Sequence, residues 1–90
     1  MELTNQLHNL AIDLLSTANV TDEEKHDKLV DEVRVRLEAF TPKAVGKTVR
    51  FKGTDTKIKI QDIYFCGSLE LKIATEGDSD VNPFLVEFVE

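Results

Sequence analysis

The period of the apolar residues changes near residue 45, and this change constrains the fold more than any other feature. In residues 3–18, and again in residues 29–40, large apolar side chains recur every three or four positions. This spacing predicts two helices that each bury one side. From Lys47 onward, apolar and polar residues alternate, which is typical of strands. We therefore expect an α+β fold with the helices first.

Capping signals predict where the helices begin and end. Asn19 tolerates the left-handed conformation and is expected to end the first helix. Thr21 and Glu24 have the spacing of a capping box, which predicts the start of the second helix. The Thr41–Pro42 step predicts its end, because the residue before proline avoids helical conformation. The short link between them predicts an antiparallel helical hairpin within residues 1–40.

The second half of the chain, residues 45–90, is predicted to form a four-stranded antiparallel meander. Its expected strands are residues 47–52, 57–61, 69–74 and 84–89, joined by turns at 53–56 and 66–68 and by a polar loop at 76–83. A slip in the alternation at Asp62–Ile63 predicts a bulge or a bend. The strands allow either a flat sheet packed on the helices or a small SH3-like barrel.

The last predicted strand has apolar residues on both faces. Alternation directs Phe84, Val86 and Phe88 toward the core, whereas Leu85 and Val89 point the other way. Such a strand is either central and covered on both sides, or an edge strand that meets a partner. A homodimer through the C-terminal strand is thus one expected arrangement.

Length and composition predict a single domain over residues 1–90 in the cytoplasm. The one cysteine, Cys66, cannot form an internal disulfide, which fits a reducing compartment. The first ten residues, MELTNQLHNL, contain no basic residue, so a signal peptide is not expected. Apolar runs are too short for a membrane span, so we expect no membrane association.

No catalytic or cofactor motif is present, and we expect a protein that is not an enzyme and has no cofactor. The candidate nucleophile Cys66 has no recognised motif around it, and His26 lies on the apolar arc of its helix. The segment Asp78–Asn82 resembles part of a calcium loop. It lacks the required glycine and glutamate, so we predict no metal site.

Charge is strongly segregated along the chain. Residues 1–40 carry nine acidic and four basic side chains, residues 41–75 carry three acidic and seven basic, and residues 76–90 carry five acidic and none basic. The whole chain has a net charge of −6. A general affinity for nucleic acid is therefore not expected.

Two surfaces of opposite sign are candidate binding sites. At 100° per residue, five carboxylates of the second helix fall within an arc of about 100°, and three loop carboxylates extend it if the loop lies nearby. These acidic candidates are Glu23, Glu24, Asp27, Asp31 and Glu38 on the helix and Glu76, Asp78 and Asp80 in the loop. The basic candidates share the outer face of the hairpin predicted over residues 47–61: Arg50, Lys52, Lys57 and Lys59.

The small size, the acidity and the compact α+β build resemble the early proteins with which bacteriophages redirect their hosts. Some members of that group are DNA mimics, which implies a basic partner such as a DNA-binding protein in the host cytoplasm. We expect an acidic protein-binding module, with inhibition of such a partner as its function. The alternative is a nucleic-acid-contacting or assembly module that uses the basic hairpin face.

Overall fold

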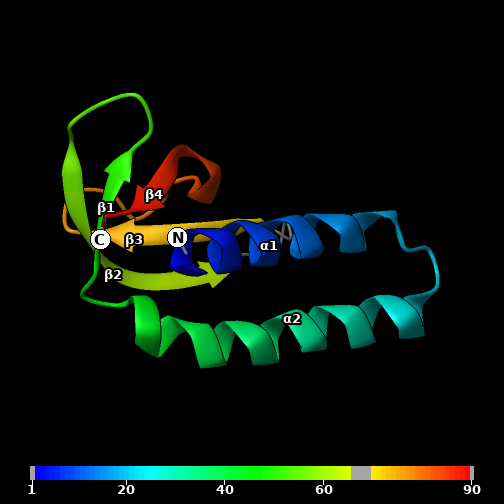
Figure 1. Cartoon of the computed structure of the whole chain (residues 1–90). Coiled ribbons are helices and arrows are strands. Elements are labelled where there is room, and N and C mark those ends of the chain that lie inside the picture. Colours follow the sequence, from blue (N-terminus) through cyan, green and yellow to red (C-terminus); the bar gives the residue numbers. More distant parts are fainter. Residues whose placement is uncertain (1, 66–69, 90) are drawn as a thin grey trace.

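The computed structural model describes residues 2–65 and 70–89, and it has the expected α+β fold. A pair of helices is followed by a four-stranded antiparallel sheet (Figure 1). The elements in chain order are α1 (Glu2–Ser16), the 3-10 turn η1 (Thr17–Asn19), α2 (Glu23–Ala44), β1 (Thr48–Phe51), β2 (Lys57–Phe65), β3 (Leu71–Thr75), the 3-10 turn η2 (Pro83–Leu85) and β4 (Val86–Phe88). Cys66, the expected turn at 66–68 and Leu69 lie outside the described residues.

The first helical segment ends where it was predicted to end, whereas the second helix begins at a different N-cap. The helical turns after α1 end at Asn19, as predicted. The predicted cap at Thr21 is wrong, because α2 begins one residue later. The Asp22 carboxylate accepts a hydrogen bond from the backbone N–H of Lys25 at 3.2 Å. Aspartate is at least as good an N-cap as threonine, and its charge suits the positive end of the helix.

The predicted end of α2 at Thr41–Pro42 is also wrong, since the helix continues through Pro42 to Ala44. Burial explains the extension: Phe40 is 3 % exposed and Ala44 is fully buried. A proline in the last turn removes only one hydrogen bond, and the Thr41 hydroxyl donates to the Leu37 carbonyl at 2.7 Å nearby. Gly46, at φ 86°, then turns the chain toward β1.

The predicted β-hairpin is confirmed as β1 and β2. Val49 lies opposite Ile58, and Arg50 lies opposite Lys57. The turn between the strands contains Gly53 at φ 79°, a conformation that suits glycine. β2 is longer than predicted, and its register shifts between Ile60 and Asp62, where the alternation slips in the sequence.

The sheet has the order β3-β2-β1-β4 and remains open, so it does not close into a barrel. The first three strands form the predicted meander, and β4 returns to the far edge and pairs with β1. A bridge between Ile73 and Val81 holds the returning segment beside β3. The fourth strand is shorter than predicted because Asn82 and Pro83 start a 3-10 turn, in which the Asn82 side chain accepts from the Phe84 N–H.

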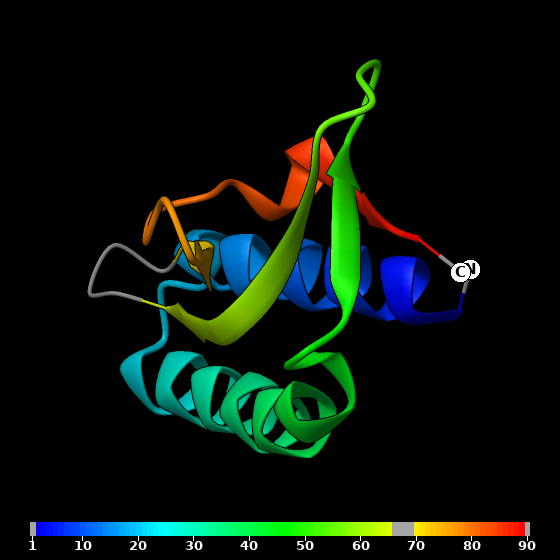
Figure 2. The same ribbon diagram turned by 90° about the vertical axis from the view of Figure 1, so that its left-hand side faces the viewer.

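Both helices pack against the same face of the sheet, and the core lies between the helices and the sheet (Figures 1 and 2). Fully buried side chains come from every layer: Leu7, Leu14, Val49, Ile60, Ile73 and Val86. The rings of Phe40 and Phe88 meet edge to face with centroids 6.3 Å apart. The helical hairpin extends past the sheet, which gives the molecule its elongated shape of 43 × 21 × 21 Å (Figure 1).

Candidate functional site

Five carboxylates follow one side of α2 and together form the acidic flank. Its members, all exposed, are Glu23, Glu24, Asp27, Asp31 and Glu38. The buried positions Val33, Leu37 and Phe40 fix the helix face that meets the core, so these acids are directed to solvent. The helix therefore holds the acidic residues predicted from its sequence on one side.

Arg34 is the cation that lies within the acidic flank. Its guanidinium is 3.5 Å from the Asp31 carboxylate and stands 5.4 Å from the centre of the Phe65 ring. The second contact draws this charge toward the end of β2, at the border of the acidic flank. His26, whose side chain is 28 % exposed, lies 3.6 Å from Asp27, and this contact is an ion pair only when the imidazole is protonated.

The other side of α2 carries charges of mixed sign. Lys25, Lys28 and Lys43 occur there beside Glu32 when residues are placed at 100° intervals. Arg36 reaches across to α1, where its guanidinium donates to Asp13 at 2.7 Å. The acidic flank is thus a local feature of one side of the helix, and Glu32 offers a comparison carboxylate on the other side.

The loop acids predicted to extend the acidic flank lie elsewhere. In both views the sheet lies between residues 76–80 and α2 (Figures 1 and 2). Asp80 is 3.3 Å from Lys72, and this contact raises the pKa of the lysine. Asp78 closes the loop, since its carbonyl accepts from the Thr75 N–H at 2.7 Å. Glu76, Asp78 and Asp80 therefore form a separate surface from the acidic flank.

The basic candidates share the outer face of the β1–β2 hairpin, as predicted from alternation. The hairpin projects beyond the helices (Figure 2), and Lys52, Lys57 and Lys59 are exposed. Arg50 pairs with Glu87 across β1 and β4, and this hydrogen bond lowers the pKa of Glu87 and raises that of Arg50. Glu76 lines a shallow hollow with Lys57 and Lys59. These carboxylates reduce the positive charge that a nucleic acid would meet.

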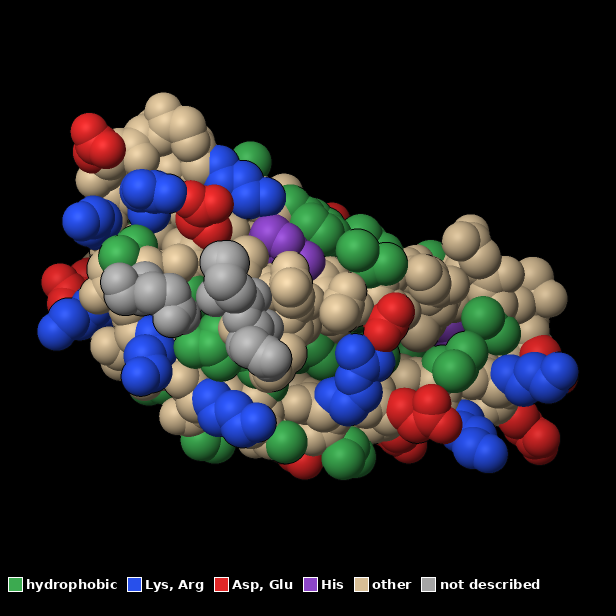
Figure 3. Space-filling view, in the orientation of Figure 1, with side chains coloured by type: hydrophobic (Ala, Val, Ile, Leu, Met, Phe, Trp, Pro, Cys, Tyr) green, Lys and Arg blue, Asp and Glu red, His purple; other side chains and the backbone are tan. Residues whose placement is uncertain are grey.

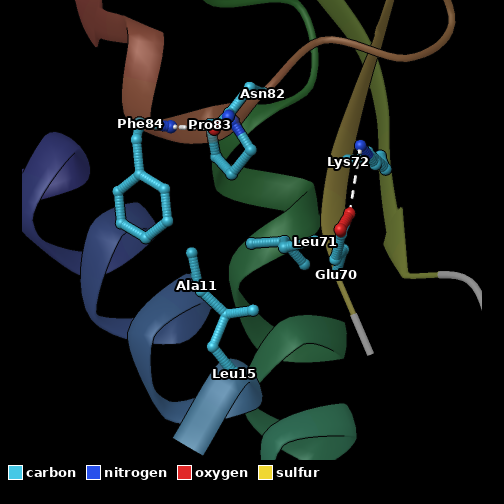
Figure 4. Close-up of a pocket in the computed structure, with 8 residues that line it drawn as sticks. All are labelled: Ala11, Leu15, Glu70, Leu71, Lys72, Asn82, Pro83 and Phe84. Atoms are coloured by element: carbon cyan, nitrogen blue, oxygen red, sulfur yellow. Dashed lines mark hydrogen bonds and ion pairs between the residues drawn. The ribbon is translucent and has the colours of Figure 1, made fainter. Parts of the chain in front are cut away.

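A hollow of about 160 Å³ between α1, β3 and η2 is a candidate ligand pocket (Figure 4). Its walls are mainly apolar, with Leu15, Leu71 and Phe84 among them. The ion pair of Lys72 with Glu70, 3.5 Å apart, lies at one side of the hollow (Figure 4). Among the residues that the structure describes, no group of three or more His, Cys, Asp or Glu side chains is placed to hold a metal ion.

The outer edge of β4, where the sequence allows a dimer seam, is covered by α1. Thr4 accepts a hydrogen bond from the Phe88 N–H at 2.9 Å, and His8 Nε2 lies 3.2 Å from the Val86 carbonyl oxygen. Both backbone groups point away from β1 and would otherwise be open to another strand. Strand addition at this edge would require α1 to give up these contacts. Val86 and Phe88 face the core as predicted, and Leu85 and Val89 are exposed.

No known protein family, curated protein or solved structure matches this chain. The resemblance to early bacteriophage proteins therefore stays a prediction. No helix within residues 2–65 and 70–89 has the length and apolar character needed to cross a bilayer. The functional proposal rests on the charged surfaces described above.

Proposed function

We propose that this protein is a non-enzymatic protein-binding module that presents the acidic flank of α2 to a basic partner. The observation that carries the proposal is the exposure of all five carboxylates on one side of a single helix, with Arg34 as the cation at its border. Helical backbone holds the five groups in a fixed row. A rigid row of like charges suits a partner that already has a cationic groove.

The spacing of the row favours a partner that normally holds nucleic acid. Residues 23–38 span about 22 Å at 1.5 Å per residue. Glu23, Asp27 and Asp31 follow at four-position steps of about 6 Å, and Glu38 lies about 10 Å further along the helix. The phosphates along one DNA strand have a comparable spacing of about 6–7 Å. The acidic flank would replace one strand of phosphates, and the module would inhibit its partner by competition with DNA.

The separate position of the loop acids limits the size of this contact. A mimic of a whole duplex would need two rows of charge, whereas the acidic flank supplies one. We therefore expect the partner to be held through a single row of salt-sensitive contacts. Nucleic-acid binding through the hairpin is the alternative, and it is less favoured because Glu87 and Glu76 stand beside its basic residues.

Affinity capture from a bacterial lysate, followed by competition with duplex DNA, tests the proposal. The critical variant is Asp27→Lys/Asp31→Lys, and the matched control is Glu32→Lys/Glu76→Lys, which changes net charge equally at other places. We expect the wild type and the control to retain a basic protein that duplex DNA displaces. Retention of that protein by the Asp27/Asp31 variant would contradict the proposal. A gel shift of labelled DNA by the protein itself, lost in Lys57→Glu, would favour the alternative.

A further inference from the structure

α1 has an exposed face with almost no charge, in a chain that carries seventeen acidic and eleven basic side chains. From Leu3 to Thr21 the one charged side chain is Asp13, and Arg36 neutralises it at 2.7 Å. Apart from Asp13, the exposed polar residues of α1 from Leu3 to Ser16 are neutral: Asn5, Asn9 and Ser16. Electrostatic repulsion between two copies of this surface would therefore be small.

Large apolar side chains are exposed on the same side of the molecule. Ile12 is 49 % exposed and Leu15 is 44 % exposed, and helical spacing places both on the side of α1 that carries His8. Beside them lies η2, where the Phe84 ring is 5.8 Å from that of His8 and Leu85 is 54 % exposed. Figure 3 shows hydrophobic and uncharged side chains along α1, between a charged sheet end and a charged helix tip. We call the surface of Asn5, His8, Asn9, Ile12, Leu15 and Ser16 the neutral face.

We propose that the neutral face binds a second copy of this chain in a two-fold symmetric dimer. In such a dimer a patch that lies on the two-fold axis meets its own copy, so a patch of one charge there would repel itself. Neither the acidic flank nor the basic hairpin can therefore pair with its own copy across the axis. The neutral face combines low charge with the exposed aliphatic side chains of Ile12 and Leu15, and the cores of homodimer interfaces are likewise poor in charge and richer in apolar area.

The position of Ile12 defines the expected geometry. A two-fold axis perpendicular to α1 pairs the two helices in antiparallel orientation, and an axis near Ile12 places the two Ile12 side chains in contact. Leu15 and His8 then flank the centre, and the asparagines at positions 5 and 9 lie at its rim, where neutral amides can hydrogen-bond. A 15-residue helix is about 22 Å long. This contact is smaller than a standard interface, so we expect a weak dimer with a micromolar to millimolar dissociation constant.

Sedimentation equilibrium from micromolar to millimolar protein tests the dimer. The disrupting variant is Ile12→Glu, and Ile12→Gln repeats the test without added charge. The matched control is Val35→Glu, because Val35 is also an exposed aliphatic residue, 63 % exposed, on α2. Circular dichroism on each variant ensures that folded proteins are compared. The full chain is used throughout.

We expect the wild type and Val35→Glu to approach twice the mass of one chain as concentration rises, and both Ile12 variants to stay at the mass of one chain. The wild-type dimer should persist in high salt, since apolar contacts are not screened. A wild type that stays at the mass of one chain at every concentration would overturn the proposal. A dimer that survives both Ile12 substitutions, or that dissociates in high salt, would also overturn it. Such a result would point to contact between the acidic flank and the basic hairpin.

Discussion

Thr4 and Phe88 connect the first turn of α1 to the last strand, through a hydrogen bond of 2.9 Å from the Phe88 N–H to the Thr4 hydroxyl oxygen. One helical turn further along α1, His8 makes the corresponding contact with the Val86 carbonyl at 3.2 Å. In the same segment, the Val89 N–H donates to the Thr48 carbonyl of β1, and the Leu85 carbonyl accepts from the N–H of Lys52, just after β1. α1 therefore takes the place that a fifth strand would have at this edge.

Removing the Thr4 hydroxyl should destabilise the protein measurably. In Thr4→Val the partly buried Phe88 N–H loses its acceptor, and we expect the free energy of unfolding to fall by about 1–2 kcal/mol. Thr4→Ser keeps an acceptor and should lose less. Urea denaturation of the three proteins measures the difference, and equal losses in both variants would argue against the hydrogen bond as the cause.

The N-cap of α2 can be tested by comparing two neighbouring residues. Asp22→Ala removes the side chain that accepts from Lys25, and we expect a loss of about 0.5–2 kcal/mol in the free energy of unfolding. Thr21→Ala should change stability little, because the helix begins after Asp22. Thermal or urea denaturation measures both, and a larger loss in Thr21→Ala would restore the cap predicted from sequence.

Pro42 makes the last turn of α2 less stable than another residue would. The proline has no N–H for the Glu38 carbonyl, and its ring crowds that carbonyl. Pro42→Ala should raise the free energy of unfolding by about 1–2 kcal/mol, after allowance for the greater freedom of the unfolded chain. Urea denaturation checks the sign. A less stable variant would mean that Pro42 has a favourable role in packing.

The Arg50–Glu87 pair should contribute stability that is lost in acid. The hydrogen bond from Arg50 lowers the pKa of Glu87 in the folded protein, so the unfolded chain takes up the proton at a higher pH than the folded one. The contribution is complete above the unfolded pKa of about 4.3 and disappears as the pH falls through the lower folded pKa.

The free energy of unfolding, measured from neutral pH down to about pH 3, should fall less in Glu87→Gln than in the wild type. Glu38→Gln is the control, because Glu38 is an exposed glutamate of α2 without an ion-pair partner among the described residues. If Glu38→Gln flattened the profile as much as Glu87→Gln, the pair would not be the cause.

The regular spacing of apolar residues in the sequence was sufficient to predict most of the fold. The buried sides of both helices and the shared apolar face of Val49 and Ile60 follow from spacing alone. The sequence did not reveal that α2 passes through Pro42, because burial of Ala44 overrides a local preference. It also did not reveal that β4 pairs with β1, since pairing between strands distant in sequence depends on the three-dimensional path of the loop.

The candidate site was predictable to a similar degree. Helical geometry fixes the acidic flank, and all five predicted residues are exposed along it. Whether residues 76–80 join them depends on tertiary arrangement, and the structure separates the two groups. The neutral face has no motif or cluster of charge in the sequence, and its signal there is the near absence of charge from Leu3 to Thr21.

The central proposal, binding through the acidic flank, is tested most directly by affinity measured against salt concentration. The captured basic protein would be titrated with wild type, Asp27→Lys/Asp31→Lys and Glu32→Lys/Glu76→Lys by isothermal calorimetry at low and high salt. We predict that the Asp27/Asp31 variant binds about tenfold or more weakly at low salt, that the control differs from the wild type by much less, and that the gap narrows in high salt. Equal weakening in both double variants would show that net charge alone governs binding and would contradict a role for the acidic flank.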